Sequence, residues 1–272
     1  MRTLHLAVAA ALLAASATAT MAQDRVARAP SPTGQAAPAS VSQGQAAIDR
    51  AAAAQKYAFI FFFREKNQQT DKAWSVFQPA VAKLADSAEV VSIQITTPAE
   101  KKVIDRYDVS RAPMPLVLAV APCGAITKAF TGAFDEKQLR TAFVSPCTQL
   151  CLKALQDRKL VFLCVVDQAN PQDRVSIPKG VEDFKADAKY GSATEIVLVN
   201  SRDKDEATFL RGFQVEPTTQ EPIVVFLAPP GSMVGKFNGT ATKQQLMAKL
   251  ASAQSDPCAG GKCGPNGCPP KK

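Results

Sequence analysis

The chain has 272 residues, of which 46% are hydrophobic and 21% are charged, with a formal net charge of +8 at pH 7. Lys and Arg are spread along the chain instead of gathering in one stretch, so the sequence predicts no nucleic-acid partner. The single histidine, His5, lies in an N-terminal segment that we expect to be removed. Histidine-based nucleophilic catalysis and histidine-ligated metal sites are therefore excluded for the mature protein.

Residues 1–22 have the parts of a secretory signal, namely Arg2, an apolar stretch and small residues that end at Ala22. We expect cleavage after Ala22 and export to the bacterial periplasm or the cell exterior. No apolar stretch reaches the roughly 20 residues that a membrane helix requires, so no membrane span is predicted. Residues 23–45 are rich in Ala, Pro, Ser and Gln, which predicts a disordered linker.

Two segments follow, 46–146 and 147–254, and each predicts the same order of elements, αβαβαββα. Their central strands are continuous apolar runs, YAFIFFF and LVFLCVV, typical of strands buried on both faces of a sheet. In the first segment the predicted strands are 57–63, 89–95, 116–120 and 125–130, and the predicted helices are 46–56, 70–84, 99–107 and 135–143. In the second segment the strands are 160–166 and 194–200 with a hairpin over 223–237, and the helices are 147–157, 179–190, 205–211 and 242–253.

Aromatic residues gather around the first central strand and the helix after it. Thr70 is the predicted N-terminal cap of that helix, and its apolar residues recur every three or four positions, which gives one apolar face. The spacing favours core packing over a binding surface for these aromatic side chains, which are Phe59, Phe61, Phe62, Phe63 and Trp74.

The two segments are copies of one unit. PLVLAVAPCG, beginning at Pro115, returns as PIVVFLAPPG, beginning at Pro222, and nine of 25 aligned positions are identical without a gap. Unrelated segments would share roughly one or two, so the pattern indicates a duplication.

A proline that opens the first strand of a late hairpin, after βαβα and before a closing helix, resembles the thioredoxin-like superfamily. The resemblance covers most of residues 46–253 and implies an α/β fold of two tandem thioredoxin-like domains, each a mixed β-sheet flanked by helices. It also implies a cis-proline in each copy. In the first copy Pro113 and Pro115 both fit, but only Pro115 has an aligned proline, so Pro115 and Pro222 are the predicted cis residues.

The sequence departs from that family at the redox site. Thioredoxin-like oxidoreductases carry Cys-x-x-Cys where the loop after the central strand enters the next helix, because the helix N-terminus stabilises the thiolate. Here Asp71 and Trp74 stand at those positions, and the matching loop of the second copy, residues 174–179, also lacks cysteine. The resemblance therefore implies the fold without the family's dithiol chemistry.

All seven cysteines lie in the exported part, where disulfides are favoured. Cys164 lies inside an apolar strand and is predicted to be an inert core residue. Cys123 lies in a hairpin turn, and a disulfide to Cys147 or to Cys151 would brace the junction of the two copies. Cys147 and Cys151 are four residues apart on one predicted helix and are unsuited to pair with each other. The alternative is that one of them is a reactive thiol at the helix N-terminus.

The tail, residues 255–272, is rich in Gly and Pro and contains Cys258, Cys263 and Cys268 at regular spacing. Three thiolates could bind one soft ion such as Cu(I), while zinc would lack a fourth ligand. The other interpretations of the tail are one disulfide with a free thiol, or attachment to another chain.

The function that these features favour is a redox-inactive thioredoxin-fold module that binds a peptide or protein, with no catalytic residues and no cofactor. A sheet edge beside the cis-proline would pair with an extended peptide and needs no cysteine. The alternatives are a thiol-disulfide oxidoreductase that uses Cys147, Cys151 or the tail, and soft-metal binding by the tail.

Overall fold

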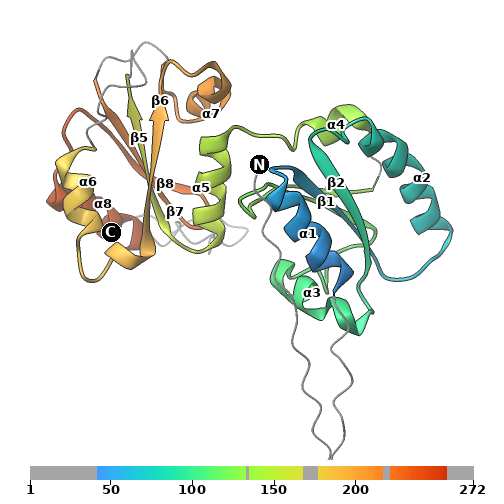
Figure 1. Ribbon diagram of the computed structural model, residues 1–272. Helices are drawn as coiled ribbons and strands as arrows, with labels where there is room; N and C mark the ends of the chain where they lie inside the picture. The colour runs from blue at the N-terminus through green and yellow to red at the C-terminus, as the bar shows by residue number, and fades with distance from the viewer. Residues whose placement is uncertain (1–41, 133–134, 168–176, 217–220, 256–272) are drawn as a thin grey trace, which may run out of the picture. The chain divides into compact units, whose positions relative to one another are not determined.

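A computed structural model describes residues 42–132, 135–167, 177–216 and 221–255. They form two four-stranded sheets, each with its own helices (Figure 1). The predicted signal peptide, residues 23–41 of the predicted linker and the tail after residue 255 lie outside the described residues. No helix in the described part of the chain is long and apolar enough to cross a membrane.

The first copy contains all eight predicted elements. Its strands are β1 (Tyr57–Phe63), β2 (Ala88–Gln94), β3 (Leu116–Val120) and β4 (Ile126–Thr131), and its helices are α1 (Gln43–Ala53), α2 (Gln68–Ala82), α3 (Lys101–Tyr107) and α4 (Glu136–Arg140). A single 3₁₀ turn, η1 (Pro98–Glu100), precedes α3.

The second copy repeats this order. Its strands are β5 (Leu160–Val166), β6 (Thr194–Asn200), β7 (Ile223–Ala228) and β8 (Ser232–Asn238), and its helices are α5 (Pro146–Gln156), α6 (Lys179–Lys185), α7 (Ala207–Gly212) and α8 (Lys243–Ser255). Two 3₁₀ turns, η2 (Gly191–Ala193) and η3 (Lys204–Glu206), precede β6 and α7.

Both sheets have the same topology. The strand order is β2-β1-β3-β4 in the first and β6-β5-β7-β8 in the second. The central strand pairs in parallel with β2 or β6 and antiparallel with β3 or β7, and the last two strands form a hairpin. In both hairpins the register shifts at the same place, between Ala119 and Val120 and between Phe226 and Leu227.

Each sheet is covered on both faces, which explains why its central strand is apolar throughout. On one face of the first sheet, α2 and α4 pack against alternate residues of β1 that include Phe59 and Phe61. On the other face, α1 and α3 pack against Ile60 and Phe62. In the second copy α6 and α8 cover one face of the sheet, and α5 and α7 cover the other. The core predicted around Phe59, Phe61, Phe62 and Phe63 is confirmed.

The backbone conformation explains why both copies have glycine at the same two positions of the hairpin. Gly132 and Gly239, which end the two hairpins, have φ of 81° and 72°, and Gly124 and Gly231 in the hairpin turns have φ of 86° and 143°. Residues with a Cβ rarely adopt such angles, so both copies keep glycine there. With the matching topology, these positions show that the molecule contains two tandem thioredoxin-like domains.

Several predicted element boundaries were wrong; α4, for example, ends at Arg140 instead of residue 143. Three other differences have a cause in the local hydrogen bonds. Helix α1 begins at Gln43, inside the predicted linker, because the Ser42 side chain accepts a hydrogen bond from Gln45 N and caps it. Helix α2 is capped by Asn67 instead of Thr70. The Asn67 side-chain oxygen accepts a hydrogen bond from the backbone N–H of Thr70. Helix α6 ends at Lys185 instead of residue 190. The Asp187 side chain accepts a hydrogen bond from Lys189 N, and this bond forms a turn that ends the helix.

Candidate functional site

Asp71 and Trp74, which the resemblance predicts at the positions of the redox cysteines, lie in the first half of α2. Asp71 is exposed, whereas the Trp74 ring is partly buried against the sheet. The Trp74 ring centroid lies 5.1 Å from that of Phe61, edge to face, and 5.6 Å from that of Phe77. Trp74 is thus part of an aromatic cluster, and its contacts with Phe61 and Phe77 fix the orientation of its ring.

A pocket with a volume of about 290 Å³ opens at this aromatic cluster. Its walls come from the end of β1, the loop and first turns of α2, and the neighbouring strand β2. The lining residues are Phe61, Phe63, Lys66, Thr70, Asp71, Trp74 and Ser92. Three aromatic rings with one lysine and one carboxylate at the sides suit an apolar side chain that enters from a bound chain.

Only one of the two predicted cis-prolines is cis. The Met114–Pro115 peptide bond is cis, and the second cis bond among the described residues is Pro229–Pro230 in the hairpin turn of the second copy. The prediction for Pro222 was therefore wrong. Pro222 does open β7 as Pro115 opens β3, and its carbonyl accepts from Gly239 N. Proline suits the start of a strand in either isomer because it only fixes φ and removes a donor, so the aligned residue did not determine the isomer.

Cys147 lies in the first turn of α5, but its environment disfavours the thiolate. Its Sγ donates a hydrogen bond to Leu198 O on β6, 3.3 Å away. Burial raises the pKa of the Cys147 thiol to about 12, and the hydrogen bond and charge of the neighbouring Glu206 carboxylate add to the rise. The reactive thiol considered for this helix end is therefore disfavoured at Cys147.

The other buried thiols are also held protonated. Burial raises the pKa of Cys151 to about 11 and that of Cys164 to about 12. Cys151 is 2% exposed in the core beneath α5, and Cys164 is fully buried in β5, where the sequence predicted an inert residue. These are the surroundings of structural thiols.

Neither predicted disulfide is formed, because the three sulfur atoms are held in different surroundings. Cys123, Cys147 and Cys151 are all free thiols. Cys123 Sγ is directed to Gln149 O at 3.7 Å, Cys147 faces the backbone of β6, and Cys151 lies in the core. The disulfides were predicted because the hairpin turn and the next helix are close in the topology. The topology does not specify where each side chain points, and a disulfide depends on that direction.

Sequence reasoning missed a buried carboxylate that caps a helix in each copy. In the first copy, Glu100 accepts from Ser42 Oγ at 2.6 Å and from Gly44 N at 3.2 Å. In the second copy, Glu206 accepts from Ser145 Oγ at 2.5 Å and from Cys147 N at 2.9 Å.

These two glutamates stand at equivalent places, each at the end of the 3₁₀ turn before the third helix, and are only 6% and 1% exposed. The available signal was an acidic residue just before a short helix in both copies, which is too common a pattern to predict a cap. Gly44 and Cys147 are likewise equivalent, each two residues after the serine at the N-cap position of its helix.

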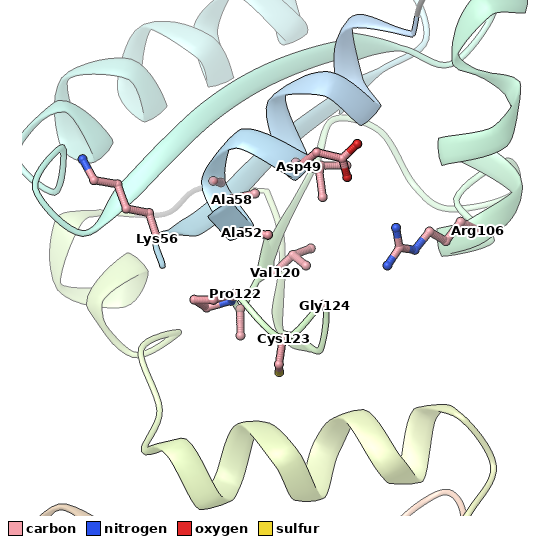
Figure 2. A pocket seen from close by; sticks show the side chains of 12 residues that line it. Asp49, Ala52, Lys56, Ala58, Arg106, Val120, Pro122, Cys123 and Gly124 are labelled. Atoms are coloured by element: carbon pink, nitrogen blue, oxygen red, sulfur yellow. The ribbon is translucent and has the colours of Figure 1, made fainter. Parts of the chain in front are cut away.

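A second, smaller pocket of about 130 Å³ lies beside the hairpin turn of the first copy. Figure 2 shows Cys123 at its rim, with Lys56 and Arg106 on opposite sides of the view. The other lining residues come mostly from α1 and from the hairpin turn that follows β3. The pocket contains a single thiol and no aromatic ring, so it offers neither a dithiol nor the apolar walls of the Trp74 pocket.

Among residues 42–255, in the parts that are described, no group of three metal-ligating side chains is close enough to hold an ion. The predicted soft-metal ligands, Cys258, Cys263 and Cys268, lie outside the described residues. Residues 174–176, half of the loop 174–179 that corresponds to the redox position in the second copy, are also outside them.

No protein-family model and no curated protein matches the chain. Among solved structures, the first two thioredoxin domains of Eps1p from Naumovozyma dairenensis are 10% identical and align with 80% of this chain and 98% of that one, with a TM-score of 0.29. Human ERp44, form II, is 11% identical over 84% of this chain and 60% of its own, with a TM-score of 0.35. The thioredoxin Deadhead from Drosophila melanogaster is 22% identical over 37% of this chain and 91% of its own, with a TM-score of 0.30. The fold itself is assigned from the strand order and helix placement of each copy, which are thioredoxin-like.

Proposed function

We propose that this protein is an exported, redox-inactive thioredoxin-fold module that binds extended segments of other proteins. The observation that carries the proposal is the Trp74 pocket, which is lined by a partly buried indole and by Asp71. The sequence predicts these two residues at the positions of a redox pair. An aromatic pocket at a sheet binds side chains through apolar contact and requires no thiol. Export is inferred from residues 1–22, and the binding of a soft metal by the tail stays a prediction.

The oxidoreductase alternative finds little support in the described thiols. An attacking cysteine must be a thiolate near neutral pH, and the pKa values of Cys147, Cys151 and Cys164 are raised by burial. No Cys-x-x-Cys occurs anywhere in the sequence.

The test uses a partner that has no thiol chemistry of its own. Reduced, carboxymethylated ribonuclease is permanently unfolded, and its cysteines are blocked. We expect it to bind the mature chain, measured by isothermal titration, and to bind equally well when Cys123, Cys147 and Cys151 are all replaced by serine. Insulin-disulfide reduction should show no turnover with either protein. Insulin turnover by the wild type that disappears in Cys147→Ser or Cys151→Ser would establish the oxidoreductase reading instead.

A further inference from the structure

Each sheet ends in a parallel edge strand, β2 in the first copy and β6 in the second. Tyr57 N bonds to Ser87 O, and Ile95 N bonds to Phe63 O, both at 2.9 Å. In the parallel register that pairs Tyr57 with Ala88, the odd-numbered residues of β2 therefore bond to β1. It follows that Val90 and Ser92 point their backbone N–H and C=O groups away from β1, toward the edge of the sheet.

The same edge of the second copy is closed by a side chain. Leu198 occupies in β6 the place that Ser92 has in β2, because Cys164 and Phe61 are equivalent in the two central strands. The Leu198 carbonyl accepts the hydrogen bond from Cys147 Sγ. An added strand would have to displace that thiol.

In the first copy the residue equivalent to Cys147 is Gly44, which has no side chain. A Cβ at Gly44 would lie 2.4 Å from Ile93 Cδ1 and 2.5 Å from Glu100 Oε2, so the surrounding packing favours glycine. No side chain from this helix position reaches the backbone of Ser92. Among the residues that the structure describes, the edge of the first sheet is thus open and that of the second is occupied.

The open edge adjoins the Trp74 pocket. Ser92 belongs to both, since its side chain lines the pocket while its backbone faces outward. Side chains of paired residues on neighbouring strands lie on the same face of a sheet. A residue of an added strand that pairs with Ser92 would therefore direct its side chain to the face that holds Phe61 and Trp74. Val90, which is 38% exposed on this face, provides a further apolar contact for the added strand.

The chemistry of the site selects its occupant. The aromatic walls favour a large apolar side chain, and phenylalanine or tyrosine can stack on Trp74. The terminal segments of this chain do not suit the site, because residues 23–41 and 256–272 contain no aromatic residue and several prolines. A second copy of β2 would present only the side chains of AEVVSIQ, again with no aromatic ring.

We propose that β2 is a strand-addition site, which binds an extended segment of a partner protein through the backbone of Val90 and Ser92 and inserts one aromatic side chain into the Trp74 pocket. This proposal rests on the proposed function and deepens it by naming the site and the ligand class. It places binding at the β2 edge of the first copy and excludes the equivalent edge of the second.

The experiment measures fluorescence anisotropy of a labelled peptide, Lys-Thr-Val-Thr-Phe-Thr-Val-Thr-Lys, with the mature full chain. Two further peptides replace the phenylalanine by alanine or by N-methylphenylalanine. In an antiparallel added strand the residue opposite Ser92 donates its N–H to Ser92 O, and N-methylation removes that bond. The variants are Trp74→Ala, which removes a pocket wall, and Ser92→Pro, which removes an outward N–H. Proline is tolerated on an edge strand when its nitrogen faces outward. Leu198→Pro, at the equivalent position of β6, is the matched control, and thermal unfolding verifies the fold of all three.

We expect Trp74→Ala, Ser92→Pro and either altered peptide to lower the affinity about 10-fold or more, as follows from losing a buried aromatic group or a backbone pairing. Leu198→Pro should bind as the wild type does. Amide ¹H–¹⁵N shifts on addition of the peptide should change most at Val90 and Ser92. Equal binding of the N-methylated peptide, or shift changes centred on Met114 and Pro115, would overturn the site. If this peptide fails to bind while carboxymethylated ribonuclease binds, the site is wrong and the proposed function stands; if both fail, both are wrong.

Discussion

At the scale of single residues, the thiol of Cys147 shows how a duplicated position can acquire a new role. A cysteine near a helix N-terminus is a common source of a reactive thiolate. Here the Cys147 backbone N–H already donates a hydrogen bond to Glu206 and is not available to stabilise the anion, and the thiol itself is partly buried. The same atom that suggested reactivity in the sequence serves instead as a hydrogen-bond donor to β6.

This environment predicts slow alkylation of Cys147. With a pKa of about 12, the thiolate fraction at pH 8 is roughly 10³-fold lower than for a thiol with a pKa of 9, and higher nucleophilicity offsets only part of that deficit. We expect iodoacetamide to modify Cys147 at least about tenfold more slowly than it modifies free glutathione at pH 8, measured by peptide mass spectrometry. Because the folded-state pKa is raised, the rate should still be rising at pH 10. A plateau below pH 9 would contradict the proposed environment.

The buried glutamates predict a second residue-scale effect. In Glu206→Ala, Ser145 Oγ and Cys147 N lose their acceptor, and a buried donor left unsatisfied costs about 1–3 kcal/mol. We expect a loss of about 2–3 kcal/mol in the free energy of unfolding, measured by urea denaturation, and a similar loss for Glu100→Ala. The glutamine variants, which keep one acceptor oxygen, should lose less. Glu65→Ala, at an exposed residue, is the control and should change stability by less than about 0.5 kcal/mol. Equal losses in the alanine and control variants would mean that the carboxylates are not caps.

At the scale of elements, the apolar runs were the most predictable feature. Four strands, β1, β3, β5 and β6, have the bounds that the sequence predicted. For β1 and β5 the reason is that a continuous apolar run ends at charged residues, Lys56 and Arg64 for β1 and Lys159 and Asp167 for β5. Helix ends were less predictable because capping depends on which of several polar residues lies at the turn, as with Asn67 and Thr70. The Glu100 and Glu206 caps were not predictable, because their partners lie 58 and 61 residues away along the chain. The pocket combines residues of β1, α2, the loop between them and β2, and the sequence singled out only Asp71 and Trp74 as site residues.

The close contact between α6 and the backbone just before α8 predicts the effect of a substitution at Gly180. A Cβ at Gly180 would lie 1.9 Å from the Ala241 carbonyl oxygen, and this contact is to backbone that cannot rotate away. We expect Gly180→Ala to lower the free energy of unfolding by about 3 kcal/mol, the upper end of ordinary overpacking. Gly212→Ala, at the end of α7 with no atom within 4 Å of the new Cβ, is the matched control and should be neutral or slightly stabilising. Chemical denaturation of both variants measures the difference, and a neutral Gly180→Ala would show that the backbone just before α8 does not approach α6 so closely.

At the scale of the whole molecule, the duplication separates what the fold requires from what one copy has acquired. The glycines with positive φ, the hairpin register shift and the buried glutamate recur in both copies, as the requirements of one fold. The Trp74 pocket and the open β2 edge are described in the first copy, whereas the second has its edge carbonyl bonded to Cys147. Comparing the copies therefore located the candidate site more sharply than the family resemblance did.

The repeat also predicts that each copy folds by itself. The two core clusters of the first copy are built from buried residues between Ile48 and Ala142, and those of the second from buried residues between Cys151 and Leu250. A domain with its own core of about this size is able to fold alone, and small single domains commonly unfold in one cooperative step. We expect residues 42–144 and residues 145–255, expressed separately, each to give one cooperative transition in scanning calorimetry, with equal calorimetric and van't Hoff enthalpies. Residues 42–144 should also retain binding of the phenylalanine peptide within about threefold, whereas residues 145–255 should not bind it. A first copy that unfolds without a cooperative transition would show that the two domains depend on each other for stability, and peptide binding by the second copy would contradict the assignment of the site to β2.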